Sequence, residues 1–240
     1  MATQAAAAVA DGVYRLGTSL VDFYLLVDDE GVTVVDAGFP RHWGQLDPAL
    51  RAAGRRPEDV RAVVLTHAHV DHTGVAERLR AERGARVHVH GGDALGGVRR
   101  FPPLFLYWRP ASWPLLVQGL RDGMLGTSRI GGFQLFDDGQ TLPVPGRPHV
   151  VHVPGHTPGS VALHLPDRGV LLTGDALVTL DPYTGARGPR VMLDGVNDDT
   201  EQARRSLARL APLGADVLLP GHGEPWHGSP AEAVERALSA

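Results

Sequence analysis

Four side chains that can bind a metal ion lie within six residues of one another, in the segment THAHVDHTG: His67, His69, Asp71 and His72. The segment stands between an apolar run expected to be a buried strand and an expected helix. Side chains two apart on an extended backbone project to the same side, so His67 and His69 can bind one ion. Asp71 and His72 belong to the turn into the helix and can face a second ion. Imidazole and carboxylate ligands at this spacing favour Zn²⁺ or a similar ion.

Three more candidate ligands follow later predicted strands, each beside a glycine that lets the backbone turn. They are His156 in PGHTPGS, Asp175 in TGD and His222 in PGHG. Taken singly, each is more often an ordinary turn residue. Their order along the chain and their chemistry, which matches that of the first segment, make a shared metal site the better interpretation.

In this order, HxHxDH, PGHTPGS, TGD and PGHG resemble the metallo-β-lactamase superfamily through nearly the whole chain. The resemblance implies one metal held by His67, His69 and His156, a second held by Asp71, His72 and His222, and Asp175 bridging the two. VVDAG resembles the family's strand-ending D-x-G. Asp36 of this motif, together with Thr66, is therefore expected to orient the ligating histidines from behind.

The expected cofactors are two Zn²⁺, with Fe or Mn as alternatives in one or both positions. Two Zn²⁺ with Asp71, Asp175 and a bridging hydroxide leave the site cationic, and bound metal lowers the pKa of water from about 15.7 to about 7. The expected reaction is attack of that hydroxide on an ester, lactone or thioester carbonyl. Asp71 is the expected catalytic residue, orienting the hydroxide and taking its proton. A β-lactam or phosphodiester hydrolase on the same site is one alternative, and a mononuclear iron thiol or persulfide dioxygenase is another.

Departures from better-known branches narrow the substrate. Asp175 stands where β-lactamases usually place Cys or Ser, which argues against β-lactams as main substrates. Acyl-homoserine lactonases carry a Tyr shortly after the bridging Asp, whereas the nearest tyrosine here is Tyr183. Glyoxalase II enzymes share the ligand set but have a longer C-terminal helical region, and RNA-processing relatives have a further domain and a more basic surface.

The hydrophobic pattern predicts two β-rich halves that each end in helices, hence an α/β fold built as a four-layer αββα sandwich. The expected helices are His42 to Ala53, Thr73 to Arg83, Thr200 to Leu210 and one from Pro230. The expected strands are Tyr14 to Leu16, Phe23 to Val27, Val32 to Val35, Val60 to Leu65, Arg86 to His90, Phe133 to Phe136, Thr141 to Val144, His149 to Val153, Val161 to Leu165, Val170 to Thr173 and Val217 to Leu219. We expect a single domain, 1–240.

Residues 91–132 interrupt this pattern with prolines and aromatic side chains, and we expect them to form an inserted cap, called the cap segment below. Its Tyr107, Trp108 and Trp113, with Tyr183, are candidates for binding substrate. The same aromatic residues are a reasonable contact in a homodimer. The seven histidines outside the ligand set are expected to be structural or solvated, with His42 and His227 exposed.

The composition excludes several other classes. The net charge of −4 and the absence of a basic cluster argue against nucleic acid as a partner. With no cysteine, any metal must be held by nitrogen and oxygen. No run of about 18 apolar residues is present, so neither a membrane span nor another membrane partner is expected. The expected protein is a cytoplasmic enzyme acting on a small molecule.

Overall fold

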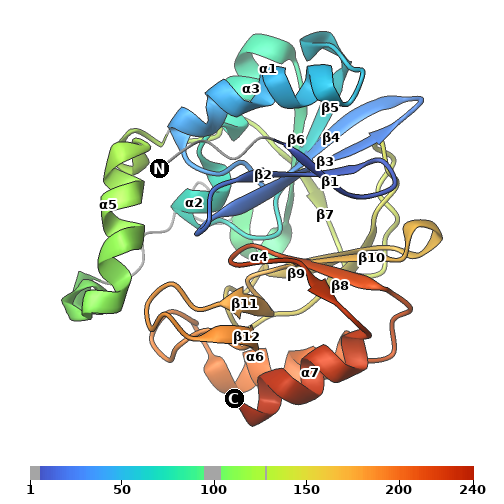
Figure 1. Ribbon diagram of the computed structural model, residues 1–240. Coiled ribbons are helices and arrows are strands. Elements are labelled where there is room, and N and C mark those ends of the chain that lie inside the picture. Colours follow the sequence, from blue (N-terminus) through green and yellow to red (C-terminus); the bar gives the residue numbers. More distant parts are fainter. Residues whose placement is uncertain (1–5, 95–103, 128) are drawn as a thin grey trace.

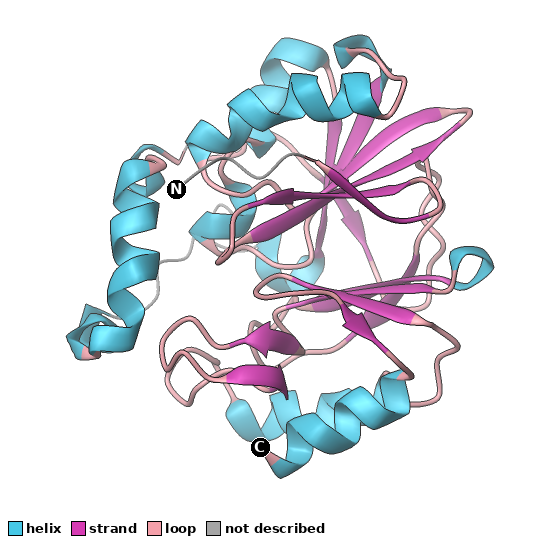
Figure 2. Ribbon diagram, in the orientation of Figure 1, coloured by secondary structure: helices cyan, strands magenta, loops and turns pink. Residues whose placement is uncertain are grey.

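Two β-sheets pack face to face, and helices cover both outer faces (Figures 1 and 2). The computed structural model describes residues 6–94, 104–127 and 129–240. Helices α1 (Trp43–Ala52) and α3 (Ala76–Arg83) lie over one sheet, and α6 (Thr200–Ser206) and α7 (Pro230–Ser239) lie over the other. The architecture is therefore the expected αββα sandwich.

The first sheet has seven strands in sequence order. They are β1 (Ala7–Ala10), β2 (Val13–Gly17), β3 (Asp22–Asp28), β4 (Gly31–Val35), β5 (Val60–Val64), β6 (Arg86–His90) and β7 (Gln134–Phe136). β1 to β4 form antiparallel pairs, whereas β4, β5, β6 and β7 pair in parallel. The ends of β4 and β5 consequently lie at the same edge of this sheet.

The second sheet has the strand order β14 (Trp226–His227), β13 (Val217–Pro220), β10 (Val170–Gly174), β9 (Val161–Leu165), β8 (His149–His152). β10 and β13 are parallel, with Gly174 paired to Pro220, so the residues that follow these strands are neighbours. The hairpin of β11 (Val178–Leu180) and β12 (Arg187–Arg190) extends beside that edge.

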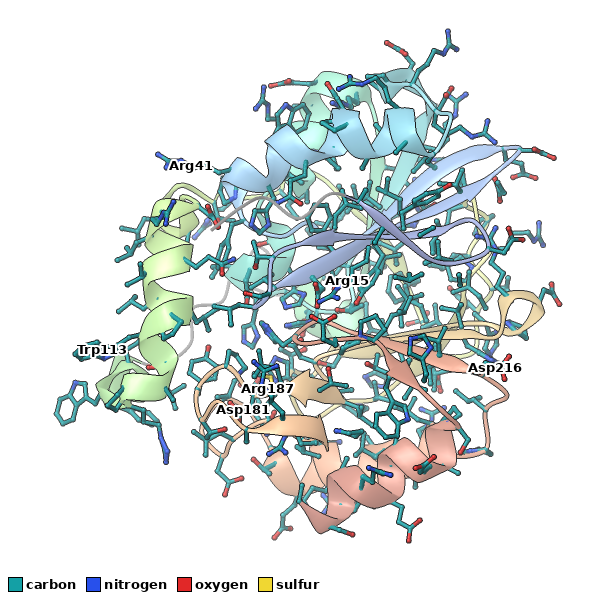
Figure 3. The ribbon with its side chains drawn as sticks, viewed as in Figure 1. Arg15, Arg41, Trp113, Asp181, Arg187 and Asp216 are labelled. Carbon is teal, nitrogen blue, oxygen red and sulfur yellow. The ribbon has the colours of Figure 1, made fainter. Side chains whose placement is uncertain are left out.

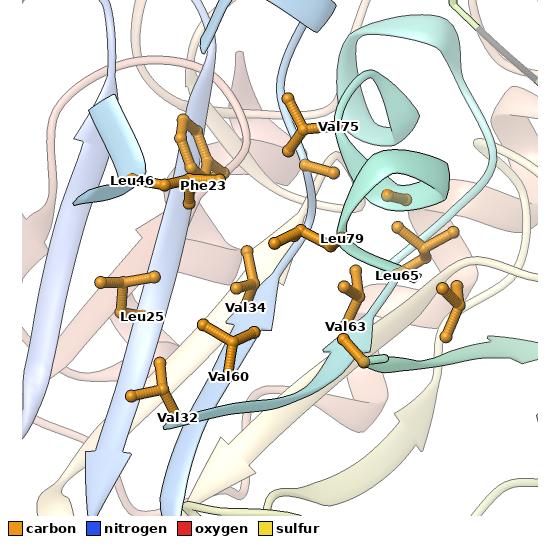
Figure 4. Close-up of a cluster of buried hydrophobic side chains, with 14 of the residues drawn as sticks. Phe23, Leu25, Val32, Val34, Leu46, Val60, Val63, Leu65, Val75 and Leu79 are labelled. Atoms are coloured by element: carbon orange, nitrogen blue, oxygen red, sulfur yellow. The ribbon is translucent and has the colours of Figure 1, made fainter. Parts of the chain in front are cut away.

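Three layers of apolar side chains hold the sandwich together. Phe23, Leu25 and Val63 belong to the layer between the first sheet and its helices (Figure 4). A second layer fills the space between the sheets, and a third lies under α6 and α7. Strand β5 alternates between layers, with Val63 facing the helices and Ala62 and Val64 facing the other sheet. This accounts for the apolar run from Ala62 to Leu65.

Between β6 and β7 the described residues form α4 (Gly91–Ala94), α5 (Trp113–Arg121) and 3₁₀ turns at Leu104–Trp108, Pro110–Ser112 and Met124–Gly126. Residues 95–103 and 128 of the cap segment lie outside the described residues. Leu106, Leu115 and Met124 pack with Phe39 and Val70 of the sandwich. The cap segment is thus attached by an apolar cluster next to the HxHxDH loop.

Several expectations about local structure are wrong. The segment Thr141 to Val144 is not a strand, because only Thr141 makes a bridge, to His149. His42 is buried rather than exposed: it stacks on Phe23 and its Nε2 lies 3.3 Å from Asp122 of the cap segment. The unexpected strands β1, β11, β12 and β14 have four residues or fewer, too few for their periodicity to be recognised.

The helix expected from Thr73 to Arg83 is two helices, α2 (Val70–Thr73) and α3. The break lies at Gly74, whose amide donates to the carbonyl of Gly38 over 2.7 Å. A Cβ on Gly74 would stand 2.3 Å from that oxygen. The loop that follows Asp36 therefore passes directly against the chain that follows His72, and only glycine fits at the contact.

We predict that Gly74→Ala lowers the free energy of unfolding by about 1 to 3 kcal/mol, because the methyl group forces two backbone segments apart. Gly44→Ala is the matched control: it lies in α1, and a Cβ there meets nothing within 4 Å. Replacing that glycine is expected to be neutral or to stabilise by up to about 1 kcal/mol. Urea unfolding of both variants measures the difference, and equal midpoints would contradict the close contact.

Candidate metal centre

All seven candidate ligands converge where the two sheets meet at one edge. His67, His69, Asp71 and His72 follow β5, Asp175 follows β10, His222 follows β13, and His156 lies in the loop between β8 and β9. The amide of Val161 donates to the carbonyl of Thr66 over 2.9 Å and ties this loop to the end of β5. All seven lie in the interior, and His69 and Asp71 are the most accessible of them, each 9% exposed.

The ligand atoms form two groups that meet at one oxygen. The first group is His67, His69, His156 and Asp175, and the second is Asp71, His72 and His222. In the first, Nδ1 of His69 lies 3.1 Å from Nε2 of His67 and 2.8 Å from Nε2 of His156. In the second, Nε2 of His222 lies 3.5 Å from Asp71 Oδ2.

Asp175 Oδ2 belongs to the first group and also lies close to two histidines of the second. It lies 3.6 and 3.4 Å from Nε2 of His67 and His156, and 3.5 and 3.1 Å from Nε2 of His72 and His222. Ligands at 2.0 to 2.1 Å from a tetrahedral zinc lie about 3.3 Å apart, so these separations suit atoms that share an ion. Asp175 is therefore placed as a bridging ligand would be.

Two buried polar atoms of this cluster lack a hydrogen-bond partner, as expected of atoms that would bind a cation. Nε2 of His72 and Oδ1 of Asp175 are buried and have no hydrogen-bond partner, although buried polar atoms rarely lack one. Nitrogen and carboxylate donors are the ligands that zinc accepts. The donor set, its separations and its unpaired atoms all fit two divalent ions.

The Nδ1 atoms of His67, His72 and His222 are bound on the side away from the cluster. Asp36 Oδ2 lies 3.0 Å from His72 Nδ1, and Thr66 Oγ1, which donates to Asp36, lies 3.1 Å from His67 Nδ1. His222 Nδ1 bonds to the carbonyl of Leu20. A proton held on Nδ1 leaves Nε2 free to bind a metal. Asp36 and Thr66 thus contact His72 and His67, and their role in orienting metal ligands stays a prediction.

Asn197 is a supporting residue that the sequence analysis missed. Its Oδ1 lies 3.0 Å from His156 Nδ1, and its Nδ2 donates to the carbonyl of Met192 and to Thr200 Oγ1. The amide is thereby oriented with its oxygen toward the imidazole. Asn197 is the only asparagine in the chain, but it lies 41 residues from His156 in a loop, and no motif links the two.

Arg15 is a second support that the sequence analysis missed. Its guanidinium is buried, bonds to both oxygens of Asp22 and reaches the carbonyl of Gly223 and the carboxylate of Glu224. Figure 3 shows it near the centre of the molecule. Burial raises the pKa of Asp22 to about 7, with Arg15 opposing the shift. This ion pair fixes the loop that carries His222.

Burial and the charges of nearby carboxylates and histidines shift the pKa values of the residues in this centre. Burial lowers the pKa of His67 and of His156. Burial would also lower the pKa of His222, but Asp175 and Asp71 outweigh it and raise this pKa to about 9. The pKa of Asp175 lies well below its usual value, because the nearby histidines outweigh the opposite effect of burial. The carboxylates of the centre thus favour cations around them.

The four candidate substrate residues divide into two pairs. Tyr107 and Tyr183 lie 6.1 Å apart between ring centroids, with their rings tilted by 54°. Burial is the main reason that the pKa of both phenols is raised, that of Tyr107 to about 12, and the charge of Asp71 adds to it. By contrast, Trp108 is 87% exposed and Trp113 is 58% exposed, and Figure 3 shows Trp113 pointing away from the body.

The family described as the metallo-beta-lactamase superfamily matches residues 16–222. The probable metallo-hydrolase YflN of Bacillus subtilis is 28% identical, over 91% of this chain and 86% of that protein. A hydroxyacylglutathione hydrolase of Cereibacter sphaeroides is 32% identical over 84% of this chain, which spans only 62% of that enzyme. The N-acyl homoserine lactonase AttM of Azorhizobium caulinodans is 30% identical, over 84% of this chain and 81% of that protein.

A solved structure gives the same result. A metallo-beta-lactamase family protein from Thermus thermophilus superposes with a TM-score of 0.67 and 30% identity, over 97% of this chain and 80% of that one. Separately, the helices in the described part of the chain are all too short or too polar to cross a bilayer.

We predict that Asn197→Ala weakens zinc binding about 10- to 100-fold, because His156 loses the group that fixes its ring and tautomer. Asn197→Asp keeps an oxygen for His156 Nδ1 and should recover part of the affinity. Chelator competition on the metal-free chain measures both variants. An alanine variant that binds both ions as tightly as the wild type would remove Asn197 from the site.

Proposed function

This chain belongs to the metallo-β-lactamase superfamily, and on that premise we propose that it is a dinuclear zinc hydrolase of esters, lactones or thioesters. The observation that carries the proposal is the position of Asp175 Oδ2, which lies within 3.6 Å of four imidazole nitrogens from both groups. His67, His69 and His156 would hold one ion, Asp71, His72 and His222 the other, and Asp175 would contact both.

Two divalent ions held there supply Lewis acidity and lower the pKa of water toward neutrality, which is the chemistry that hydrolysis of a carbonyl compound requires. The residues of the chain supply the rest. Asp71 is the more exposed of the two carboxylates, with 12% of its side chain accessible against 2% for Asp175, and its Oδ2 lies 3.9 Å from His72 Nε2. We assign it two roles: ligand of the second ion and acceptor of the proton released during hydrolysis.

Tyr107 and Tyr183 are the side chains best placed to bind the substrate. Both phenols are near enough to Asp71 to feel its charge, and their raised pKa values keep them protonated at neutral pH. A protonated hydroxyl can donate a hydrogen bond to a carbonyl oxygen that gains negative charge during attack. Trp108 and Trp113 are exposed rather than packed beside Asp71 as the two tyrosines are, so we exclude them from the proposed substrate site.

The names of the relatives support a carbonyl substrate. One is named for hydrolysis of a hydroxyacylglutathione and another for hydrolysis of an N-acyl homoserine lactone. An apolar cluster containing Val70, Val178 and Met192 surrounds Tyr183 and packs against the cap segment. Such a wall beside the phenol pair fits a substrate with an apolar acyl group.

Metal analysis followed by a substrate panel tests the function. We expect two zinc ions per chain, hydrolysis of at least one lactone, thioester or aryl ester, loss of activity with chelator and recovery with Zn²⁺. The panel also contains a phosphodiester and a chromogenic β-lactam, which we expect to react at least tenfold more slowly. One iron per chain would support thiol or persulfide oxidation instead, and hydrolysis that persists without any metal would end the proposal.

Tyr107→Phe tests the phenol pair. We predict that kcat/KM for the best substrate falls about tenfold, the effect of one lost hydrogen bond to a partly charged oxygen. Zinc content should stay at the wild-type value because the phenol is not among the proposed ligands. Trp108→Phe changes the exposed aromatic residue next in the chain; it is the control and should leave kcat/KM within twofold. Equal effects of the two changes would contradict the assignment.

A further inference from the structure

A buried carboxylate outside the ligand set joins the two loops that carry the first group of histidines. Asp93 follows β6 in the short helix α4 and is 4% exposed. Its Oδ2 accepts hydrogen bonds from the amide of Ala68 and from Thr157 Oγ1, each over 2.8 Å. Its Oδ1 accepts one from the amide of Gly159, also over 2.8 Å. Both oxygens are therefore bound: Oδ2 contacts both loops, and Oδ1 contacts the loop of His156.

Two of the three partners of Asp93 are immediate neighbours of proposed metal ligands. Ala68 lies between His67 and His69, and Thr157 follows His156. These three histidines form the first group with Asp175. Ala68 follows a strand of the first sheet, whereas Thr157 lies in a loop of the second, so a single carboxylate ties the sheets together at the site. None of its bonds reaches the second group.

Close packing fixes the length of this connection. A Cβ on Gly159 would stand 2.5 Å from the amide nitrogen of Asp93, and a Cβ on Gly92 would stand 2.7 Å from the carbonyl of Pro158. The backbone of α4 thus lies directly against the loop of His156. Hydrogen bonds to an ionised carboxylate are stronger than those between neutral groups. The close backbone contacts and the three hydrogen bonds of Asp93 together fix α4 against the loop of His156.

We propose that Asp93 is a positioning residue that sets the spacing between His156 and the pair His67 and His69, and through it the affinity of the first metal position. The inference rests on the dinuclear centre of the proposed function. A ligand set already held at the right separation binds an ion without the entropic cost of ordering its loops. Loss of Asp93 should therefore weaken the first position and spare the second.

Asp93→Asn is the test because it keeps the shape and leaves one oxygen. Whichever way the amide turns, its NH₂ group meets the amide hydrogen of Ala68 or of Gly159, and at least one bond is lost. The change is introduced into two backgrounds of the full chain. His222→Ala removes a ligand of the second group, and His69→Ala removes a ligand of the first.

Zinc affinity is measured in each background by chelator competition on the metal-free chain. We expect Asp93→Asn to weaken zinc about 10- to 100-fold in the His222→Ala background, and less than about threefold in the His69→Ala background. Equal losses in both backgrounds, or no loss in either, would overturn the proposal. This readout does not require activity: a chain that binds two zinc ions but hydrolyses nothing contradicts the function alone, whereas a chain that binds none contradicts both.

Two further variants separate positioning from stability. Asp28→Asn is the matched control: Asp28 also accepts a long-range bond, from the amide of Gly146, but lies at the opposite end of β3 from Asp22. It should leave zinc affinity unchanged.

If Asp93→Asn fails to fold, Thr157→Val replaces it as the test. This change removes one bond to the carboxylate, together with the bond to Ser160 Oγ, in a side chain of the same shape. It should weaken the first position in the same direction by a smaller factor, and unchanged affinity would refute the proposal.

Discussion

The site depends on one buried carboxylate, that of Asp175, whose Oδ2 lies within 3.6 Å of imidazole nitrogens from four separate ligands. A buried anion is tolerated only where positive charge and hydrogen bonds compensate for the lost water. The histidines supply part of that compensation, and bound cations would complete it. The two sheets therefore have to meet at this edge, because each contributes ligands that the other lacks.

The sandwich meets that requirement through parallel strand pairs. β10 and β13 end side by side, which brings Asp175 next to His222 although 46 residues lie between them. β4 and β5 do the same for Asp36 and the loop of His67 to His72. The ligands thus come from loops that follow strands, while the apolar layers hold those strands in register. Rigid strands placed this way reduce the freedom that the loops must lose when an ion binds.

The seven candidate ligands could be predicted from the sequence because each sits in a short motif whose residues are neighbours in the chain, and their role as ligands stays a prediction. Asp36 and Thr66 were predicted for the same reason. Asn197, Asp93 and Arg15 were not predicted, because their roles depend on partners elsewhere in the chain. Asn197 lies 41 residues from its partner His156. The partners of Asp93 lie 25 to 66 residues away, and those of Arg15 lie 7 to 209 residues away. Hydrophobic periodicity indicated the layers and most strands. It could not show that the loop after Asp36 presses on Gly74, or that His42 is buried against the cap segment.

The cap segment shows why residue type predicts the metal ligands better than the substrate residues. Tyr107 and Trp108 are adjacent aromatic residues in one 3₁₀ turn, yet the phenol packs beside Tyr183 while the indole is almost fully exposed. A ligand must be an imidazole or a carboxylate, whereas a wall of the substrate pocket needs only shape. Val70, between His69 and Asp71, belongs to the same apolar cluster as Leu106 and Leu115. The packing of the cap segment is thereby connected to the loop of His67 to His72. In the proposed hydrolase, a change in the cap segment would alter which acyl group fits while the seven proposed ligands remain the same.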